Sequence, residues 1–564
     1  MKKFIFFIAI GFLPFLLFIV FEFSLRFFKI GIADDPFTEV PGTSYLVSNV
    51  QYPQIFNKYS DETVTTQSLK SELFNRTSPE GVLRGFLLGE STPQGFPYFP
   101  NNSFGKMTQE ALNYSSPNIK WEIINASASA MTSYYVRETA QKLLKYDPKF
   151  LILYVGHNEF YGTISQSSSP FHSARLLYIW LNQYRSFQLI FKALSFNSQD
   201  STTGTTLMEK QFNSRKFPDD EQMNSKAYLD YWDNIQFVIN LYSDKNIPVI
   251  LFNPVANYIS MPPFDSVKGD VNPSDVDVLY KSLLSNDKFK AQAALLQLNE
   301  STGSSKNAVV QYLSAFYKAK TDVINLNNFI KAQDLDAIPF RMKSYFKEQL
   351  KNSITEWNIN HLKPTTFIDL DDIFQKKVGD WYFSNKYFVD HVHFNWAGHA
   401  EVSKILSQIL QKEFPDVVDP IKLAYINDDI QNYLPLAHCN PAFEIIALNS
   451  LMRLFQRPPF SSMQVPYGYP ELMTQISKNI LIQDEDLKKS LESVKSEDIL
   501  NTIAKYLYDK GRLQEYKQLI EDMIFINPGS SLGYDLLANF LTTHSDDLET
   551  IEILRVQAKK LKVN

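Results

Sequence analysis

The stretch VLRGFLLGESTPQG, residues 82–95, joins a short apolar run to a turn of small and polar residues. A run of this length, ended by a glycine, is typical of a strand that is buried on both faces of a parallel sheet. Glu90 and Ser91 follow the terminal Gly89 directly. The sequence therefore predicts a buried strand that brings a carboxyl group and a hydroxyl group to one edge of a sheet.

Four further segments share this character, being short, apolar or β-branched and bounded by Gly, Pro or Asn. They are WEIIN (121–125), FLILYVG (150–156), IPVILFNPV (247–255) and TFIDL (366–370). Helix-period stretches lie between several of them, such as YVRETAQKLLKYD (135–147) and YLDYWDNIQFVINLYSDKN (228–246). This alternation predicts an α/β fold with a parallel sheet wrapped by helices.

Small and polar residues follow three of these strands, where a parallel sheet binds its ligands. The clusters are GESTPQG (89–95), NASASAMTS (125–133) and GHNEFYG (156–162), and a fourth cluster, DHVHFNWAGH (390–399), comes late in the chain. Together they offer a hydroxyl, backbone N–H donors in small-residue turns, the Asn158 amide and an Asp/His pair. This set matches the needs of acyl transfer: a nucleophile, a base, an orienting carboxylate and oxyanion donors.

The four clusters, in this order, resemble the sequence blocks of the SGNH, or GDSL-type, hydrolases. The resemblance covers residues from about 82 to 162 and from about 365 to 412. It implies a three-layer α/β/α domain with Ser91 as nucleophile and Asp390 and His393 as the other members of a catalytic triad. It also implies an oxyanion hole made by the Asn158 side chain and the backbone N–H groups of Ser91 and Ala130.

The chain departs from the family pattern at three positions. Glu90 and Glu159 stand where the family usually has Asp, and Ala130 stands where it has Gly. Ala130 keeps the backbone N–H but tolerates a positive φ less well than glycine does. We interpret Glu90 and Glu159 as groups that support the loops.

The spacing Asp390-x-x-His393 lets the carboxylate reach back to the imidazole at the start of a helix, which would fix the tautomer of His393. His391 is expected at the polar rim of the site, with substrate contact as the alternative. Arg341, in the phrase DLDAIPFR, is expected in a surface salt bridge or in contact with an anionic substrate. Ser91 has an alternative role as a helix cap.

No HExxH motif or cysteine pair accompanies the histidines, and Cys439 is the single cysteine. We therefore expect no metal and no cofactor. The 55 basic and 61 acidic residues nearly balance, giving a net charge of -6, which makes nucleic acid an unexpected partner.

The N-terminus has Lys2 and Lys3 followed by a mostly apolar run, Phe4–Phe21, of about 18 residues, a length that can cross a bilayer. We expect residues 1–30 to form a single-pass membrane anchor with the catalytic domain on the extracytoplasmic, periplasmic side. Cleavage after a weak Gly31-x-Ala33 site is the alternative.

The expected domains are a hydrolase domain over 75–415, with a helical insertion at about 265–360, and a helical region over 419–564. The helical region resembles tetratricopeptide units and would bind a protein partner or pack on the hydrolase.

The expected function is that of a serine esterase that removes short acyl groups from an envelope glycan. A lipid ester is the second expected substrate. An O-acyltransferase with the same triad, or a weakly catalytic envelope scaffold, are the alternatives.

Overall fold

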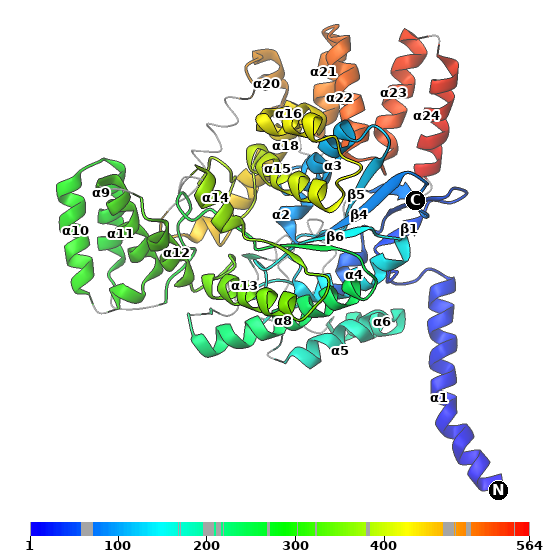
Figure 1. The fold of residues 1–564 in the computed structure, drawn as a ribbon, viewed down its shortest axis with the longest axis horizontal. Coiled ribbons are helices and arrows are strands. Elements are labelled where there is room, and N and C mark those ends of the chain that lie inside the picture. The colour runs from blue at the N-terminus through cyan, green and yellow to red at the C-terminus, as the bar shows by residue number, and fades with distance from the viewer. Residues whose placement is uncertain are drawn as a thin grey trace.

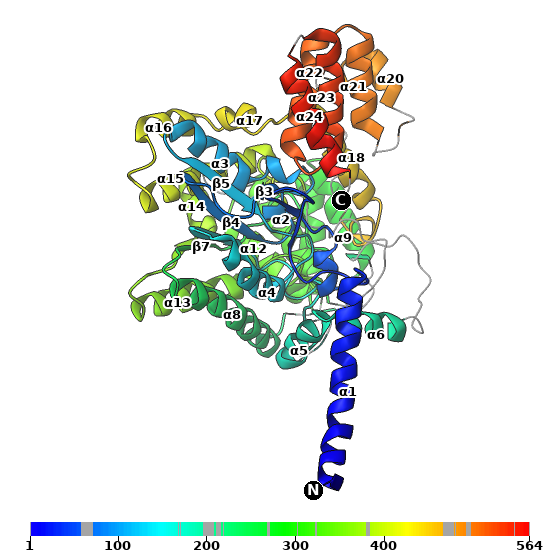
Figure 2. The same ribbon diagram turned by 90° about the vertical axis from the view of Figure 1, so that its right-hand side faces the viewer.

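The structure is a computed structural model. It describes residues 2–57, 72–166, 171–195, 219–267, 271–301, 303–321, 324–378, 384–465, 481–491, 498–545 and 547–562, and a few isolated positions between them. Side chains are described from residue 14 onward. A central sheet lies between helices, a group of C-terminal helices covers one end of the body, and helix α1 extends away from it (Figures 1 and 2).

Five strands form the central sheet, and all of them are parallel. They are β4 (Val82–Gly89), β5 (Lys120–Asn125), β6 (Phe150–Tyr154), β7 (Val249–Phe252) and β8 (Thr366–Ile368). All five coincide with predicted strands, so the prediction of a mixed α/β fold with a parallel sheet is confirmed.

The strand order β5-β4-β6-β7-β8 places β4 between its two successors in sequence. The chain leaves β4 to one side to form β5 and then returns to the other side to form β6. In open parallel sheets, ligands bind at such a reversal, outside the carboxyl ends of the strands. The loop after β4, which carries Glu90 and Ser91, lies at this reversal.

Helices cover both faces of the sheet because alternate side chains of each strand point to opposite faces. Phe86 and Leu88 of β4 belong to a core shared with α4 (Ser133–Leu143), α8 (Glu221–Ser243) and α13 (Ser344–Ile359). Leu87 belongs to the opposite core, shared with α3 (Phe104–Ser115) and α15 (Trp396–Glu413). The result is a three-layer α/β/α arrangement.

Four helices lie beside the sheet within the region predicted as a helical insertion (Figure 1). They are α9 (Pro273–Leu284), α10 (Lys288–Glu300), α11 (Ala308–Thr321) and α12 (Leu326–Asp334). Helix α13 also falls inside the predicted insertion, but it packs on the sheet as part of one helical layer. A small antiparallel sheet, β1 (Phe37–Glu39), β2 (Tyr45–Ser48) and β3 (Leu73–Asn75), precedes the main sheet.

Helices are the regular elements in the described part of the chain after residue 419, as predicted. Helices α16 (Pro420–Asp428) and α17 (Tyr433–Leu436) pack against α3. After them come α18 (Pro441–Phe455), the short 3-10 helix η9 (Phe460–Ser462), α20 (Glu485–Leu491) and two helical pairs. The pairs are α21 (Ile499–Asp509) with α22 (Leu513–Ile526), and α23 (Ser531–His544) with α24 (Leu548–Leu561). The similarity of these pairs to tetratricopeptide units stays a prediction.

Helix α1 spans Lys2–Phe27. More than half of the apolar run Phe4–Phe21 lies before residue 14, where side chains fall outside the described part of the structure. In the described part of the chain, none of the helices has both the length and the apolar character that crossing a bilayer requires.

Candidate active site

Ser91 lies directly beyond the carboxyl end of β4, as the first residue of the short helix α2 (Ser91–Gln94). Gly89 lets the backbone pass close to the adjacent strand at this point, because a Cβ at that position would lie 2.0 Å from the carbonyl oxygen of Tyr154. Gly95 ends α2 at a φ of 101°, in the left-handed region that glycine favours. The backbone therefore places the Ser91 hydroxyl, which is partly exposed, at the edge of the sheet.

A chain of short hydrogen-bond contacts joins the three residues of the predicted triad. The Oγ of Ser91 lies 2.7 Å from Nε2 of His393, and Nδ1 of His393 lies 2.6 Å from Oδ2 of Asp390. Asp390 is fully buried. Burial by itself would raise the pKa of Asp390, but the charges of His393 and His391 and the hydrogen bond from His393 hold that pKa well below its ordinary value. Asp390 is therefore a carboxylate suited to orienting an imidazole.

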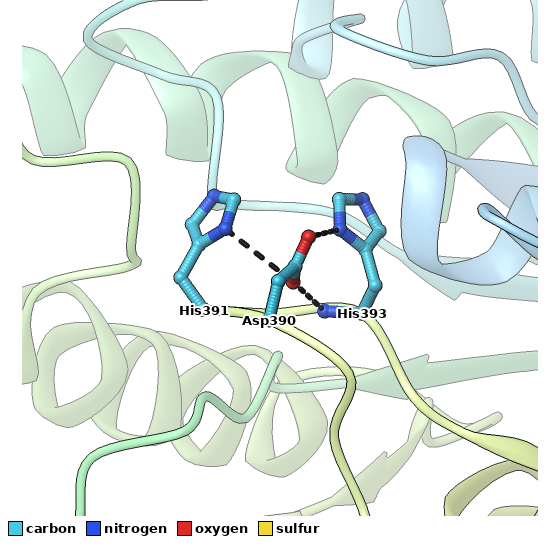
Figure 3. Close-up of side chains that lie close together, drawn as sticks. All are labelled: Asp390, His391 and His393. Atoms are coloured by element: carbon cyan, nitrogen blue, oxygen red, sulfur yellow. Dashed lines mark hydrogen bonds and ion pairs between the residues drawn. The ribbon is translucent and has the colours of Figure 1, made fainter. Parts of the chain in front are cut away.

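The Asp390–His393 segment forms a turn rather than the start of a helix, which corrects the prediction. Oδ1 of Asp390 accepts the backbone N–H groups of Val392 and His393, both at 2.9 Å. The N–H of Val389 donates to the carbonyl oxygen of His393 at 2.9 Å, and helix α15 begins only at Trp396. One carboxylate oxygen thus shapes the turn while the other contacts the imidazole, as Figure 3 shows.

Glu90 links the loop after β4 to the loop after β6. Its Oε1 accepts the backbone N–H of His157 at 2.9 Å, and its Oε2 accepts the backbone N–H of Asn158 at 3.2 Å and the side-chain amide of Asn158 at 2.7 Å. Burial raises the pKa of Glu90 to about 8, and the backbone donors oppose this rise. Glu90 therefore supports the loop after β6, and it does so by holding Asn158 in place.

The residues predicted for the oxyanion hole lie at the carboxyl ends of three neighbouring strands. Ala130 has a φ of 61°, so it adopts the left-handed conformation despite its Cβ. Within the described residues, the backbone N–H groups of Ser91 and Ala130 make no hydrogen bond. The Asn158 amide has two N–H groups, and Glu90 accepts one of them. Three donors therefore remain available at this edge.

Glu159 fixes the loop after β5 against the loop after β6. Its Oε1 accepts the backbone N–H of Ser133 at 2.7 Å, and its Oε2 accepts the Ser133 hydroxyl at 2.9 Å. The N–H of Thr163 donates to the carbonyl oxygen of Ala130 at 2.9 Å. Burial raises the pKa of Glu159 to about 7. The segment from Ala130 to Ser133 is thus held at one end by a backbone hydrogen bond and at the other by a buried carboxyl group.

His391 is buried and does not lie at the rim of the site, so the predicted position is wrong. Its ring contacts the aromatic rings of Phe264, Phe340 and Phe460 at centroid distances of 5.2, 6.2 and 5.8 Å. Its Nδ1 lies 3.4 Å from Oδ1 of Asp390 and has no hydrogen-bond partner among the described residues. Burial lowers the pKa of His391 to about 4, and the buried ring gives no support to a substrate contact.

Arg341 is also buried, so neither a surface salt bridge nor a contact with substrate in solution fits its position. Its Nη1 lies 3.7 Å from Oδ2 of Asp336, and its Nη2 donates to the carbonyl oxygens of Met261 and Pro262, both at 3.3 Å. The guanidinium carbon lies 5.4 Å from the centroid of the Phe264 ring. Arg341 therefore joins the segment after β7 to the segment before α13, beneath the His391 ring.

Asp390, His391 and His393 have ligand atoms within 4.8 Å of one another, so their residue types and spacing could hold a metal ion. The hydrogen bonds argue for another use of the same atoms. Both oxygens of Asp390 accept N–H groups of the turn or the imidazole, and both ring nitrogens of His393 have partners. A metal would have to replace these bonds, and chelation tests this directly.

Two contacts of the site were not anticipated. Phe96 packs its ring 4.6 Å from the His393 ring, and the Thr92 hydroxyl donates to the carbonyl oxygen of Val392 at 3.1 Å. Both residues lie within GESTPQGF, but only the fold brings this segment beside the turn some 300 positions later.

Comparisons with known proteins do not assign a function to this chain. No protein family model matches the chain, and no curated protein matches it. Among solved structures, the chain is similar to a two-domain esterase active on acetylated mannans that was crystallised with mannopentaose. The sequence identity is 14%, the TM-score is 0.23, and the match covers 60% of this chain and 51% of that one. The chain thus spans about half the length of that structure, and a similarity at this level carries no argument about function.

The raised pKa of Glu90 predicts how stability depends on pH. Between its ordinary value of 4.5 and about 8, the folded protein keeps a proton on Glu90 that the unfolded chain releases. Rising pH across this range therefore favours the unfolded chain, by at most about 4 kcal/mol. Glu90→Gln removes the titrating group, so the free energy of unfolding of this variant should fall less between pH 5 and 8 than that of the unmodified protein.

The measurement is urea unfolding at a series of pH values, with the slope against pH as the readout, because Glu90→Gln also loses acceptors and shifts the absolute stability. Glu110→Gln, a substitution at a partly exposed helical residue, is the control. Parallel slopes for Glu90→Gln and the unmodified protein would show that Glu90 is ionised throughout.

Proposed function

We propose that this chain is a serine ester hydrolase. The observation that carries this conclusion is the continuous contact from the Ser91 hydroxyl through the His393 ring to the buried Asp390 carboxylate. A hydroxyl is a weak nucleophile until an adjacent base removes its proton, and an imidazole held by a carboxylate is suited to that task. The available donors of Ser91, Ala130 and Asn158 support the same assignment.

In the proposed reaction, Oγ of Ser91 attacks the ester carbonyl carbon while Nε2 of His393 takes the hydroxyl proton. Asp390 stabilises the resulting imidazolium, and the backbone N–H groups of Ser91 and Ala130 with the Asn158 amide stabilise the oxyanion. The C–O bond of the ester then breaks, and His393 gives the proton to the leaving alcohol. Water, activated by His393 in the same way, hydrolyses the acyl-enzyme and regenerates Ser91.

Short acyl groups on an envelope glycan are the proposed substrates. The candidate residues lie in the short helix α2 and in loops and turns at the sheet edge, which we interpret as a site for a small acyl group. Phe96, which contacts the His393 ring, is partly exposed, as are Phe99 and Trp396, so these rings are the candidates for stacking on sugars, whereas Tyr98, Tyr161 and Phe394 are buried. A single-pass anchor in the envelope membrane, with the catalytic domain on the periplasmic side, remains part of the proposal.

The nucleophile is tested by replacing Ser91 with alanine. Because no other hydroxyl contacts Nε2 of His393 among the described residues, Ser91→Ala should abolish ester hydrolysis and labelling by a fluorophosphonate probe, with the fold retained. Ser490→Ala, at an exposed position on α20, should label like the unmodified protein. Undiminished labelling of Ser91→Ala would refute the assignment.

The two histidines flanking Asp390 should differ in kinetic effect. His393→Ala removes the base and should lower kcat by about a thousandfold or more, as loss of a triad member does. His391→Ala removes a ring that packs among aromatics, so it should cost stability and much less of the kcat of the folded fraction. Prolonged dialysis against a chelator should leave activity unchanged. Equal losses in kcat for both variants, or loss on chelation, would point to a metal site instead.

The acyl group is tested with a series of p-nitrophenyl esters of increasing chain length, followed by acetate release from O-acetylated glycans. Highest kcat/KM for acetyl and propionyl esters, with acetate released from at least one glycan, is the expected result. Ser91→Ala serves as the blank for both assays. A preference for long acyl chains without any acetate release would assign a lipid ester as substrate.

A further inference from the structure

Two helices at the base of helix α1 carry apolar side chains on their outer surface. They are α5 (His172–Asn182) and α6 (Arg185–Ser195), joined by a tight connection. In both views they lie at the end of the body from which α1 extends (Figures 1 and 2). Leu177 and Trp180 of α5 and Ile190 and Leu194 of α6 are exposed, and their spacings of three and four place each pair on one face of its helix.

The opposite face of α5 and the connection to α6 hold the pair on the body. Arg175 donates to Oδ2 of Asp230 on α8 at 2.6 Å, and Gln183 donates to Glu138 on α4 at 2.9 Å. Ile179 belongs to the main core. These contacts therefore keep the apolar residues on the outer side of the hairpin.

The apolar surface of the hairpin continues onto α1 through aromatic contacts. The ring of Phe18 on α1 lies 6.0 Å from Tyr184 and 5.7 Å from Phe187, and Tyr184 lies 5.5 Å from Trp180. Beside Phe18, α1 exposes Phe15, Leu16, Leu17, Ile19, Val20 and Phe21. Apolar side chains of α1 and of the hairpin are thus in contact where the two meet.

Glu22 fixes the angle between α1 and the hairpin. It is buried, and its carboxylate accepts the backbone N–H groups of Arg185 and Ser186, at 3.1 and 2.9 Å, and the Ser186 hydroxyl at 2.9 Å. These are the first N–H groups of α6, which have no acceptor within the helix and lie at the positive end of its dipole. The acidic residue that follows the apolar run of α1 thus attaches α1 to α6.

We propose that the outer face of α5 and α6, together with the exposed apolar face of α1, docks on the surface of a lipid bilayer. Amphipathic helices bind bilayers by burying an apolar face at the boundary between headgroups and acyl chains, and Trp and Tyr favour that boundary. Trp180 and Tyr184 lie where the hairpin meets α1, as such a boundary requires. The bilayer, rather than a protein, is the occupant because the surface is continuous with a helix whose sequence is uncharged from Phe4 to Phe21. This inference is independent of the proposed esterase activity.

The test places a fluorescent label at single cysteines of the full-length chain in a Cys439→Ser background. Leu177→Cys and Leu194→Cys report on the hairpin, where the native side chains are 55% and 68% exposed. Phe289→Cys on α10, where the native side chain is 89% exposed, is the matched control away from the proposed surface. The protein is reconstituted into vesicles of phosphatidylcholine and phosphatidylglycerol, with or without bromine on the acyl chains.

Labels at 177 and 194 should be quenched by the brominated lipids and should be several-fold less sensitive to aqueous iodide than the label at 289. Iodide quenching as strong as at 289 would overturn the inference, because the hairpin would then face water. Protection from both quenchers would also overturn it, because a second copy or another protein would then cover the face. Since all three positions are exposed, labelling should leave the helical circular dichroism spectrum unchanged, which checks the fold.

Discussion

The buried carboxyl group of Glu90 joins the loops that follow two neighbouring strands, β4 and β6, at the edge where the candidate site lies. It follows β4 in the chain and accepts N–H groups of His157 and Asn158, which follow β6. Gly89 leaves no room for a side chain between these strand ends, so the two backbones approach closely and the carboxyl group spans the remaining gap. This link joins the segments that carry Ser91 and Asn158, the proposed nucleophile and oxyanion donor.

The two histidines beside Asp390 show how neighbours decide the use of chemically identical side chains. His393 has the hydroxyl of Ser91 on one ring nitrogen and the carboxylate of Asp390 on the other, so it can take the hydroxyl proton while the carboxylate stabilises the imidazolium that forms. His391 is enclosed by Phe264, Phe340 and Phe460, where a charged imidazole is costly, and its pKa falls to about 4. Asp390 can therefore serve one imidazole without competition from a second charged one.

Parts of the chain far from the sheet complete the surroundings of the site. Phe460 comes from the short helix η9 in the C-terminal region, yet its ring contacts both His391 and Phe264. Arg341 and Asp336 lie before α13 and form a buried ion pair beneath the same ring. The C-terminal helical region is thus joined to the candidate active site by packing.

The sequence by itself determined the strands, the layers and the members of the candidate site. The runs at 82–89 and 150–156 are apolar because both sheet faces are covered, and this pattern is local, so it can be recognised without the fold. The resemblance of the four blocks to those of the SGNH hydrolases likewise predicted that Ser91, Asn158, Asp390 and His393 belong to one site. Only the tertiary structure decided that Asp390 shapes a turn instead of a helix, that His391 and Arg341 are buried, and that α5 and α6 continue the apolar surface of α1. These features depend on contacts between residues far apart in the chain, such as Phe460 with His391 and Glu22 with Ser186. The sequence also does not show whether the hydrogen-bonding groups of a charged or polar residue are paired with water or with a buried partner.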